Sequence, residues 1–364
     1  MNGQRDIVSL SLPLTGGVIL GLLLAAFRPL RNSPSGLYVL AALTAAGLFA
    51  MLWLVPARRV RRFFPVAALF VLLGLFCALS DSLAIRPVVE PWPQASAFLR
   101  TRVEAVPFPS EETGALVLAL TTGDRSGLDQ ATVQMFRQSG ASHLLALSGL
   151  HLGILYGLLL LLLRPLGNSR TGKWVRGVSL VVLAGAYTMA TGASPSLVRA
   201  FLFILLNEAG RLLVRRPSPV QVLCGALTLQ LALTPSVASS VGFQLSYLAM
   251  AGIVLLFPRL SAWYPSEGPV RDRWNLPRRL WELMALSISC QAFTGPLAWL
   301  RFGTFPKYFL LTNLLAMPLT NLLMMLAVAC VGLSSLGCCP ALLLSACDKT
   351  ARLLLQVLGV IAGM

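Results

Sequence analysis

The fold is decided by residues 143–157, which read His-Leu-Leu-Ala-Leu-Ser-Gly-Leu-His-Leu-Gly-Ile-Leu-Tyr-Gly and lead directly into the apolar run 158–163. An apolar stretch of this length is typical of a helix that crosses a lipid bilayer. Ser148 and His151 are three residues apart, so on a helix they share one face. We therefore expect a membrane helix that carries a polar stripe.

The same stretch carries a second stripe made of glycine. Gly149, Gly153 and Gly157 recur at intervals of four residues, which places them on one side of a helix. Small residues at this spacing let two membrane helices approach closely. We expect these three glycines to form a helix-packing surface.

The composition extends this interpretation to the whole chain. Of its 364 residues, 56% are hydrophobic and only 12% are charged, too few to cover the surface of a soluble protein of this size. The sequence predicts an all-α, polytopic membrane protein with roughly eleven transmembrane helices. The expected spans lie near residues 7–27, 37–55, 63–79, 143–163, 177–192, 196–214, 219–234, 241–257, 281–300, 309–331 and 341–363.

Three regions follow from the spacing of these runs. Residues 1–81 form an N-terminal three-span region that begins with an uncleaved signal anchor. Residues 82–142 are rich in proline and in charges of both signs, which predicts an extracytoplasmic linker. Within it, 113–122 and 128–139 are expected to be two short amphipathic helices on the membrane surface. Residues 143–364 form a multi-span core.

Positive charge indicates the orientation. Arginines at positions 58, 59, 61 and 62 lie between two expected spans, and further Lys and Arg residues recur in alternate loops. Cytoplasmic loops carry this excess, so the N-terminus is predicted to be cytoplasmic and the 82–142 segment to lie outside. The same rule explains most of the net charge of +16 without a nucleic-acid ligand.

Arg199 is different because it lies inside an expected span. Ser196, Arg199 and Asn207 form a polar stripe on an otherwise apolar helix. A charged arginine within a span costs at least about 2.5 kcal/mol unless it finds a partner, a cavity or the interface. Three interpretations follow: snorkelling to the interface, an internal ion pair with Glu208, or a fixed positive charge facing a water-filled path.

Other polar residues recur at membrane depth, namely Gln230, Gln244, Ser246, Gln291, Thr294, Asn313 and Asn321. Each alone is more typical of contacts between helices than of a ligand site. Together they are more numerous than a purely structural bundle requires. They are therefore candidates for the lining of a hydrated passage.

Several chemical functions are not expected. Residues 167–174 nearly match a phosphate-binding loop, but Trp174 replaces the magnesium-binding hydroxyl and no strand precedes the loop. His143 and His151 are eight residues apart and are the only histidines, so no metal or other cofactor is expected. The seven cysteines contain no C-x-x-C pair and indicate no disulfide framework.

The Ser148 and His151 pair raises the alternative of an intramembrane serine hydrolase. A catalytic dyad also needs an oxyanion hole and a substrate pocket, and the sequence indicates neither. We therefore expect no enzymatic activity. Any energy from ATP would then come from another protein.

Five segments together resemble the ComEC-type competence family, in family order across residues 114–317. They are ALTTGDRSGL (119–128), GASHLLALSGLH (140–151), TGASPSLVRA (191–200), VGFQLS (241–246) and 291–296 with Pro318. The resemblance implies a bacterial cytoplasmic-membrane channel that moves single-stranded DNA inward during natural transformation. Its implied DNA path would draw on His143, Ser148, His151, Ser196, Arg199, Asn207, Phe243, Gln244, Ser246 and Gln291.

Two features depart from the family pattern. The 82–142 segment is too short to hold an oligonucleotide-binding barrel as well as two helices, and two histidines are too few for a metallo-β-lactamase-like nuclease domain. We therefore expect an isolated competence core. Its expected partners are single-stranded DNA, membrane lipids, a separate DNA receptor and a cytoplasmic helicase or strand-binding protein. The alternative is a permease or exporter for a smaller solute built on the same bundle.

Overall fold

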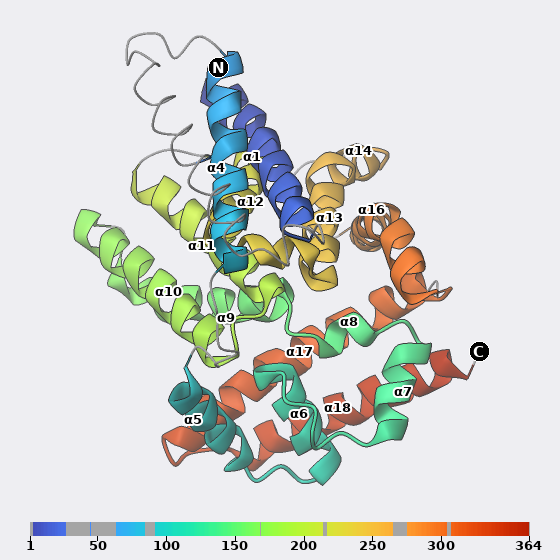
Figure 1. Ribbon diagram of the computed structural model, residues 1–364. Coiled ribbons are helices and arrows are strands. Elements are labelled where there is room, and N and C mark those ends of the chain that lie inside the picture. The colour runs from blue at the N-terminus through green and yellow to red at the C-terminus, as the bar shows by residue number, and fades with distance from the viewer. Residues whose placement is uncertain are drawn as a thin grey trace. The chain divides into compact units, whose positions relative to one another are not determined.

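The computed structural model describes residues 3–26, 44, 63–83, 92–167, 169–213, 217–264, 275–303 and 307–363. Every element within these ranges is a helix, which confirms the all-α prediction for this part of the chain (Figure 1). The expected span near 37–55 and the arginines at 58–62 lie outside the described residues.

The chain divides into two compact units that do not follow the sequential division expected from the sequence. Unit 1 comprises Met1–Val89 and Leu205–Tyr247, and unit 2 comprises Glu90–Ile204 and Leu248–Met364. Both units therefore contain segments of the expected 143–364 core. The three-region division stays a prediction.

Unit 1 is built around two closely packed helices, α1 (Gly3–Ala26) and α4 (Phe63–Leu83). Gly17 and Gly74 lie where each helix meets backbone atoms of the other, so neither position has room for a side chain. The unit also contains α12 (Pro219–Leu233), η2 (Pro235–Ser239), the second half of α11 (Pro195–Leu212) and the first half of α13 (Val241–Leu255).

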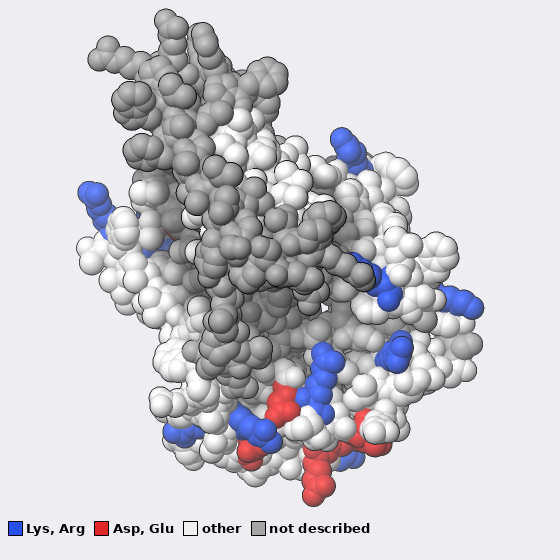
Figure 2. All heavy atoms as spheres, viewed as in Figure 1, with Lys and Arg blue, Asp and Glu red and all other residues white. Residues whose placement is uncertain are grey.

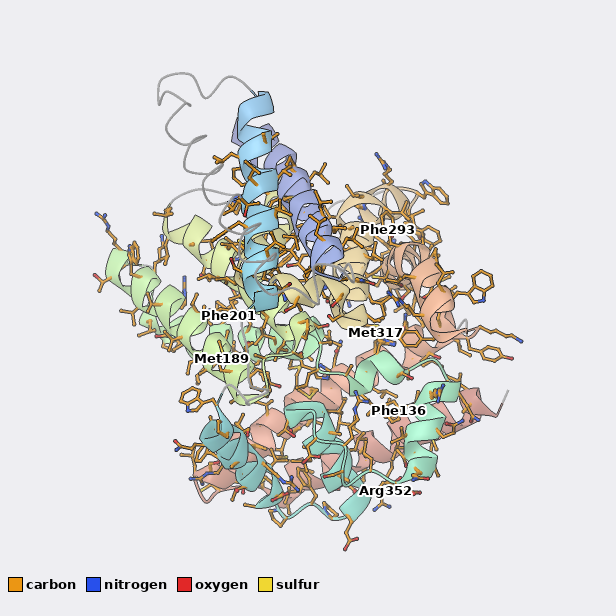
Figure 3. All side chains as sticks on the ribbon, in the orientation of Figure 1. Phe136, Met189, Phe201, Phe293, Met317 and Arg352 are labelled. Atoms are coloured by element: carbon orange, nitrogen blue, oxygen red, sulfur yellow. The ribbon has the colours of Figure 1, made fainter. Side chains whose placement is uncertain are left out.

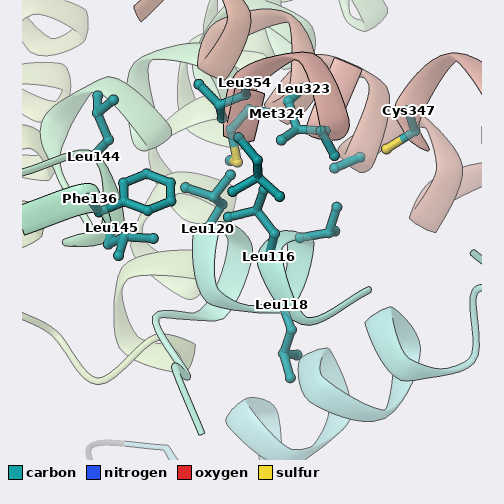
Figure 4. Close-up of a cluster of buried hydrophobic side chains, with 14 of the residues drawn as sticks. Leu116, Leu118, Leu120, Phe136, Leu144, Leu145, Leu323, Met324, Cys347 and Leu354 are labelled. Carbon is teal, nitrogen blue, oxygen red and sulfur yellow. The ribbon is translucent and has the colours of Figure 1, made fainter. Parts of the chain in front are cut away.

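Besides the first half of α11 and the second half of α13, unit 2 holds the remaining described elements. They are α5 (Pro93–Glu104), α6 (Glu111–Thr122), α7 (Gln130–Gln138), α8 (Ser142–Leu145), α9 (Gly149–Leu162), η1 (Arg164–Leu166), α10 (Arg170–Ala190), α14 (Phe257–Ser261), α16 (Leu276–Phe302), α17 (Phe309–Ser335) and α18 (Ala341–Ala362). Its main core joins α6, α7 and α8 to α17 and α18, with Leu116, Phe136, Leu323 and Leu354 among the buried side chains (Figure 4).

The two expected amphipathic helices are present as α6 and α7, but only α7 has the burial pattern of an amphipathic helix. In α7 only Thr132 and Phe136 are buried, as an amphipathic helix requires. In α6 every residue from Leu116 to Thr121 is buried, so the amphipathic prediction is wrong for α6. The apolar run of α6 is instead covered by α17 and α18.

By length and composition, two helices in the described residues could cross a membrane, α16 and α17. Shorter apolar helices cover 11–26, 67–82 and the bounds of α9, α12 and α13. Asp348, Lys349 and Arg352 interrupt the apolar sequence of α18. The eleven expected spans are thus not confirmed as a set.

Charged side chains gather in one part of unit 2. On the face shown in Figure 2, acidic side chains lie along α5 to α7 beside basic ones, whereas the other visible charges are isolated basic residues. Arg100 of α5 pairs with Glu104 at 2.8 Å and with Asp124 at 2.7 Å. This mixed surface agrees with the composition of the 82–142 segment.

Candidate functional site

The candidate site starts at the first turn of α9. Ser148 has an extended backbone and is the N-cap residue, and its hydroxyl oxygen accepts a hydrogen bond from the Leu150 N–H at 3.2 Å. In return, the Ser148 N–H donates to Nδ1 of His151 at 3.1 Å. This reciprocal arrangement is a capping box, with histidine in the place usually taken by Glu or Gln.

The capping box corrects the expectation that Ser148 and His151 lie on one face within a helix. The structure does bring the two side chains together, with Ser148 Oγ 3.1 Å from His151 Nδ1. However, Ser148 precedes the helix because its backbone is extended, and Gly149 is the first helical residue. The contact satisfies the N–H groups at a helix start, which accounts for the pair without nucleophilic chemistry.

His151 is almost completely buried, with 1% of its surface exposed. Nδ1 accepts from a backbone N–H, so the proton of the neutral ring lies on Nε2. Within the described residues Nε2 has no hydrogen-bond partner. The site thus contains a buried N–H donor that the surrounding described atoms do not satisfy.

Arg199 lies in the second turn of α11 and is 8% exposed. A Cβ atom added to Gly149 would lie 3.1 Å from Arg199 Nη2 and 3.3 Å from the Cβ of Ala200. The guanidinium therefore packs against the first turn of α9, and Gly149 makes room for it. The interpretations of this charge, as a snorkelling residue, an ion pair with Glu208 or a charge facing a water-filled path, stay predictions.

A loop between α6 and α7 holds the segment that leads into α9. The Arg125 guanidinium donates two hydrogen bonds, of 3.2 and 2.9 Å, to the carbonyl oxygen of Leu145 at the end of α8. Gly123, with φ of 83°, lies against the Leu147 side chain. The loop thus contacts the chain just before the Ser148 cap.

Asp124 stabilises the same loop. It accepts a hydrogen bond from the Ser126 N–H at 2.9 Å and pairs with Arg100. Hydrogen bonds from Ser126, and then the charge of Arg100, hold the pKa of Asp124 below its usual value. Sequence reasoning quoted this loop only as a family segment and missed that Arg125 positions the start of α9.

Helices α9, α10 and α11 pack around a small core of Leu152, Ala184 and Leu197. The ring of Phe201, labelled in Figure 3, lies against Gly185, where an added Cβ would be 3.1 Å from it. The Tyr187 hydroxyl donates to the Thr121 carbonyl at 2.7 Å and so joins α10 to α6. These contacts join α10 to α11 and to α6.

Comparison with known proteins places this arrangement in a family. Residues 120–364, which include α9 and Arg199, match the model of the family described as competence protein. The chain belongs to the competence protein family. The membership confirms the resemblance drawn from the five sequence segments.

Three curated relatives support the membership of this competence protein. It is 34% identical to ComE operon protein 3 of Bacillus subtilis strain 168 over 147 residues, which are 40% of this chain and 18% of that protein. It is 27% identical over 218 residues to recombination protein 2 of Haemophilus influenzae, covering 57% and 27% of the two chains. An uncharacterized protein, YcaI of Escherichia coli K12, is 25% identical over 235 residues, covering 63% and 29%.

The match covers only part of these relatives, since the competence chain spans less than a third of the length of each. No solved structure matches it.

Of the three glycines expected to pack against another helix, one contacts a described residue. Gly149 meets Arg199 and Ala200, as above. A Cβ added at Gly153 or Gly157 would have no described atom within 4 Å, and both glycines are exposed. In the described part of this competence protein, the packing contact is therefore limited to the first turn of α9.

The α13 candidates belong to unit 1 and have partners within that unit. Phe243 packs on Tyr247, with ring centroids 4.6 Å apart, and the Tyr247 hydroxyl donates to Gln230 Oε1 at 2.9 Å. Gln244 donates from Nε2 to the Ala238 carbonyl at 2.8 Å. Ser246 is buried.

The remaining candidates are only partly buried or exposed. His143 is exposed, and its Nδ1 lies 3.2 Å from the Gly140 carbonyl oxygen. Ser196 and Asn207 are half-buried on α11. Gln291 is half-buried beside an open apolar groove of about 490 Å³ on α16. The described contacts thus join Ser148 to His151, and they place Arg199 against Gly149 in the same turn of α9.

Among the described residues, no three His, Cys, Asp or Glu side chains are grouped so that they could hold a metal ion.

Proposed function

We propose that this competence protein is an integral membrane component of DNA uptake, which moves one strand of DNA across the bacterial cytoplasmic membrane during transformation. Family membership supports a role in competence. The observation that carries the proposal is the buried arginine, Arg199, packed against the positive end of α9. A polyanion crossing lipid needs fixed positive charge of this kind along its path.

Helix α16 supports insertion in a membrane. Trp281 and Trp299 are 18 residues apart near its two ends, which corresponds to about 27 Å of helix and matches a hydrocarbon core of about 30 Å. Arg278 and Arg279 precede the first tryptophan, and Arg301 follows the second. Tryptophan belts with basic residues beyond them are typical of the two membrane interfaces.

The proposed role involves no covalent step. The protein lies in the membrane with its N-terminus in the cytoplasm and forms a passage for the DNA strand. A separate motor protein supplies the driving energy. The proposed partners are single-stranded DNA, lipids, a DNA receptor outside and a helicase or strand-binding protein inside. Ser148, His151 and Arg199 are the residues for which packing supports a place on the path.

The test separates surface binding of DNA from its entry. A competent strain without its own channel would be complemented with this chain, and labelled DNA would be measured at the surface and in the cytoplasm. We expect Arg199→Ala to lower entry by about a hundredfold, the effect of losing a charged hydrogen-bond contact, with surface binding unchanged. Arg170→Ala, at an exposed arginine of α10, is the matched control.

Normal entry in an Arg199→Ala strain with a normal amount of protein in the membrane would contradict the proposal. Entry of a small labelled solute instead of DNA would favour a solute permease.

A further inference from the structure

We infer that an open groove on α16 is the contact surface for a second copy of this chain, with the Gln291 amides of the two copies hydrogen-bonded to each other. This inference rests on the proposed function in one respect, because it takes α16 as a helix inserted in the membrane. It goes further in assigning a partner to a surface that the described contacts leave open.

The groove is formed by one side of α16. Its volume is about 490 Å³, and its lining is apolar except for the side chain of Gln291. The lining residues recur every three or four positions from Ile288 to Trp299, so they share one side of the helix. Phe309 of α17 also lines the groove, which therefore lies within unit 2.

A different set of α16 residues already packs inside the unit. Ser289 and Phe293, the latter labelled in Figure 3, lie against Gly252 of α13, where an added Cβ would overlap the Ser289 carbonyl group and lie 3.2 Å from the Phe293 ring. On the groove side, Ala292 is exposed and Trp299 is 62% exposed. The groove is thus a part of α16 that the described residues do not cover.

Gln291 places a polar group near the middle of the expected span. It lies ten residues after Trp281 and eight before Trp299, which is about 15 and 12 Å along the helix. Its amide has no hydrogen-bond partner among the described residues. Hydrocarbon offers an amide no hydrogen bond, so an unpaired amide at this depth costs free energy until a partner supplies one.

The backbone adds an acceptor beside this amide. Pro296 lies inside α16 and has no N–H, so the carbonyl oxygen of Ala292 loses the donor that a helix normally supplies. Ala292 follows Gln291 in the chain and lines the same groove. A donor that enters the groove therefore meets two kinds of acceptor, a backbone carbonyl and a side-chain amide.

These features favour a second copy of the chain over a lipid chain. An acyl chain fills an apolar groove, but it neither donates nor accepts a hydrogen bond. A primary amide has both donors and an acceptor, so it pairs with an identical amide. Two copies related by a twofold axis along the membrane normal bring Gln291 of one copy to the same depth as the same residue of the other. Amide bonds between helices, with small residues such as Gly295 that allow close approach, are typical of helix contacts in membranes.

The first experiment measures association of the full chain in lipid vesicles. Donor-labelled and acceptor-labelled copies are mixed, and energy transfer is followed as added lipid dilutes them. We expect Gln291→Leu, which keeps a similar size but removes the amide, to raise the dissociation constant of the dimer about tenfold. Thr294→Val is the matched control, because the Thr294 hydroxyl bonds the Cys290 carbonyl of its own helix at 2.9 Å. It should leave the dissociation constant unchanged.

A second pair of variants tests the shape of the groove. Ala292 is exposed, so Ala292→Phe adds a ring to the groove without entering the core of the monomer. We expect it to weaken association by about thirtyfold, because the two helices no longer approach closely. Leu300→Phe, at a position that is 76% exposed and does not line the groove, should have no effect. Equal association of Ala292→Phe and wild type would overturn the inference.

Trp299 reports what fills the groove. Lipids with brominated acyl chains quench a tryptophan that they touch, and the share of Trp299 is the difference between the wild type and Trp299→Phe. We expect this share of the quenching to fall as the copies associate. Strong quenching without energy transfer would assign the groove to a lipid chain, and weak quenching without energy transfer would assign it to another segment of the same chain. Either result overturns the inference.

DNA entry, measured in the complemented strain, separates this inference from the proposed function. A wild-type chain that stays monomeric and still supports entry would overturn the inference and leave the proposed function standing. A wild-type chain that forms the dimer but supports no entry would reject the proposed function alone. Loss of entry in Gln291→Leu with unchanged association would place the amide on the DNA passage and overturn the dimer contact.

Discussion

The starts of α6 and α9 share a serine N-cap but differ in their acidic residues, because α6 has Glu111 and Glu112 in its first turn and Asp348 beside it, whereas the first turn of α9 has none. Each has a serine N-cap and an arginine close by. At α6 the protein supplies the anion, Asp348, which is 6% exposed and has three partners. At α9 the first turn has no acidic residue and leaves a buried N–H free of described partners. The difference teaches that a helix start can be satisfied by a carboxylate from a distant helix, as at α6, or by its own capping box, as at α9.

Removing the built-in anion should give the largest effect. In Asp348→Ala, the Ser110 and Thr113 hydroxyls lose a charged acceptor, and we expect a loss of about 3 kcal/mol in the free energy of unfolding. The measurement is denaturant or thermal unfolding in detergent micelles, and the affinity for a labelled oligo-dT single strand, at a temperature where both proteins are folded, should be unchanged. Asp129→Ala, at an exposed N-cap of α7 without a side-chain cap bond, is the control. A loss of less than about 1 kcal/mol would contradict the view that Asp348 stabilises the fold.

Arg199 and Arg352 should differ in their effect on the salt dependence of DNA binding. Arg199→Lys keeps the charge and loses the planar fork, so we expect about tenfold weaker oligo-dT binding with the same salt dependence. Arg199→Gln should also lower the slope of log affinity against log salt by about 0.7, the value for one phosphate of a single strand. Arg352→Gln, at the α6 start, should leave this slope unchanged. An unchanged slope in Arg199→Gln would remove Arg199 from the DNA contact.

Two glycines of one helix test the close approach. Gly149→Ala places a Cβ 3.1 Å from Arg199 Nη2 and so moves the guanidinium, and we expect about fivefold weaker oligo-dT binding, or about 1 kcal/mol. Gly153→Ala meets no described atom within 4 Å and should stabilise the helix by about 0.5–1 kcal/mol without affecting binding. Equal binding by the two variants would show that Arg199 does not depend on the α9 start.

The sequence predicted the helical class and the approximate bounds of several helices, because long apolar runs determine them. The span expected near 309–331 corresponds to α17, Phe309–Ser335, and the one near 281–300 lies within α16. The amphipathic prediction failed for α6 because the segments that cover it, α17 and α18, lie some 200 residues further along the chain. Local pattern alone does not reveal such a cover.

The candidate site was predictable in part. The three-residue spacing correctly predicted that the Ser148 and His151 side chains lie close together. The sequence also contained the pattern of a helix cap, because Ser148 stands three residues before His151 at the start of an apolar run. The spacing of Gly149, Gly153 and Gly157 predicted three equivalent packing positions. Which of them is in contact depends on where the neighbouring helix lies, and the local sequence does not show that. The link from Ser110 to Asp348 joins positions 238 residues apart, and nothing in either local sequence indicates it.

The smallest expected effect concerns the cap hydroxyls themselves. Ser148→Ala and Ser218→Ala each remove one N-cap oxygen, so each should lower the free energy of unfolding by about 0.5–1 kcal/mol. In both variants the N3 side chain still accepts the backbone N–H, because that bond does not use the hydroxyl. Matched unfolding curves would therefore show that the two caps are equivalent as helix starts. A much larger loss in Ser148→Ala would mean that the hydroxyl also orients the buried His151 ring.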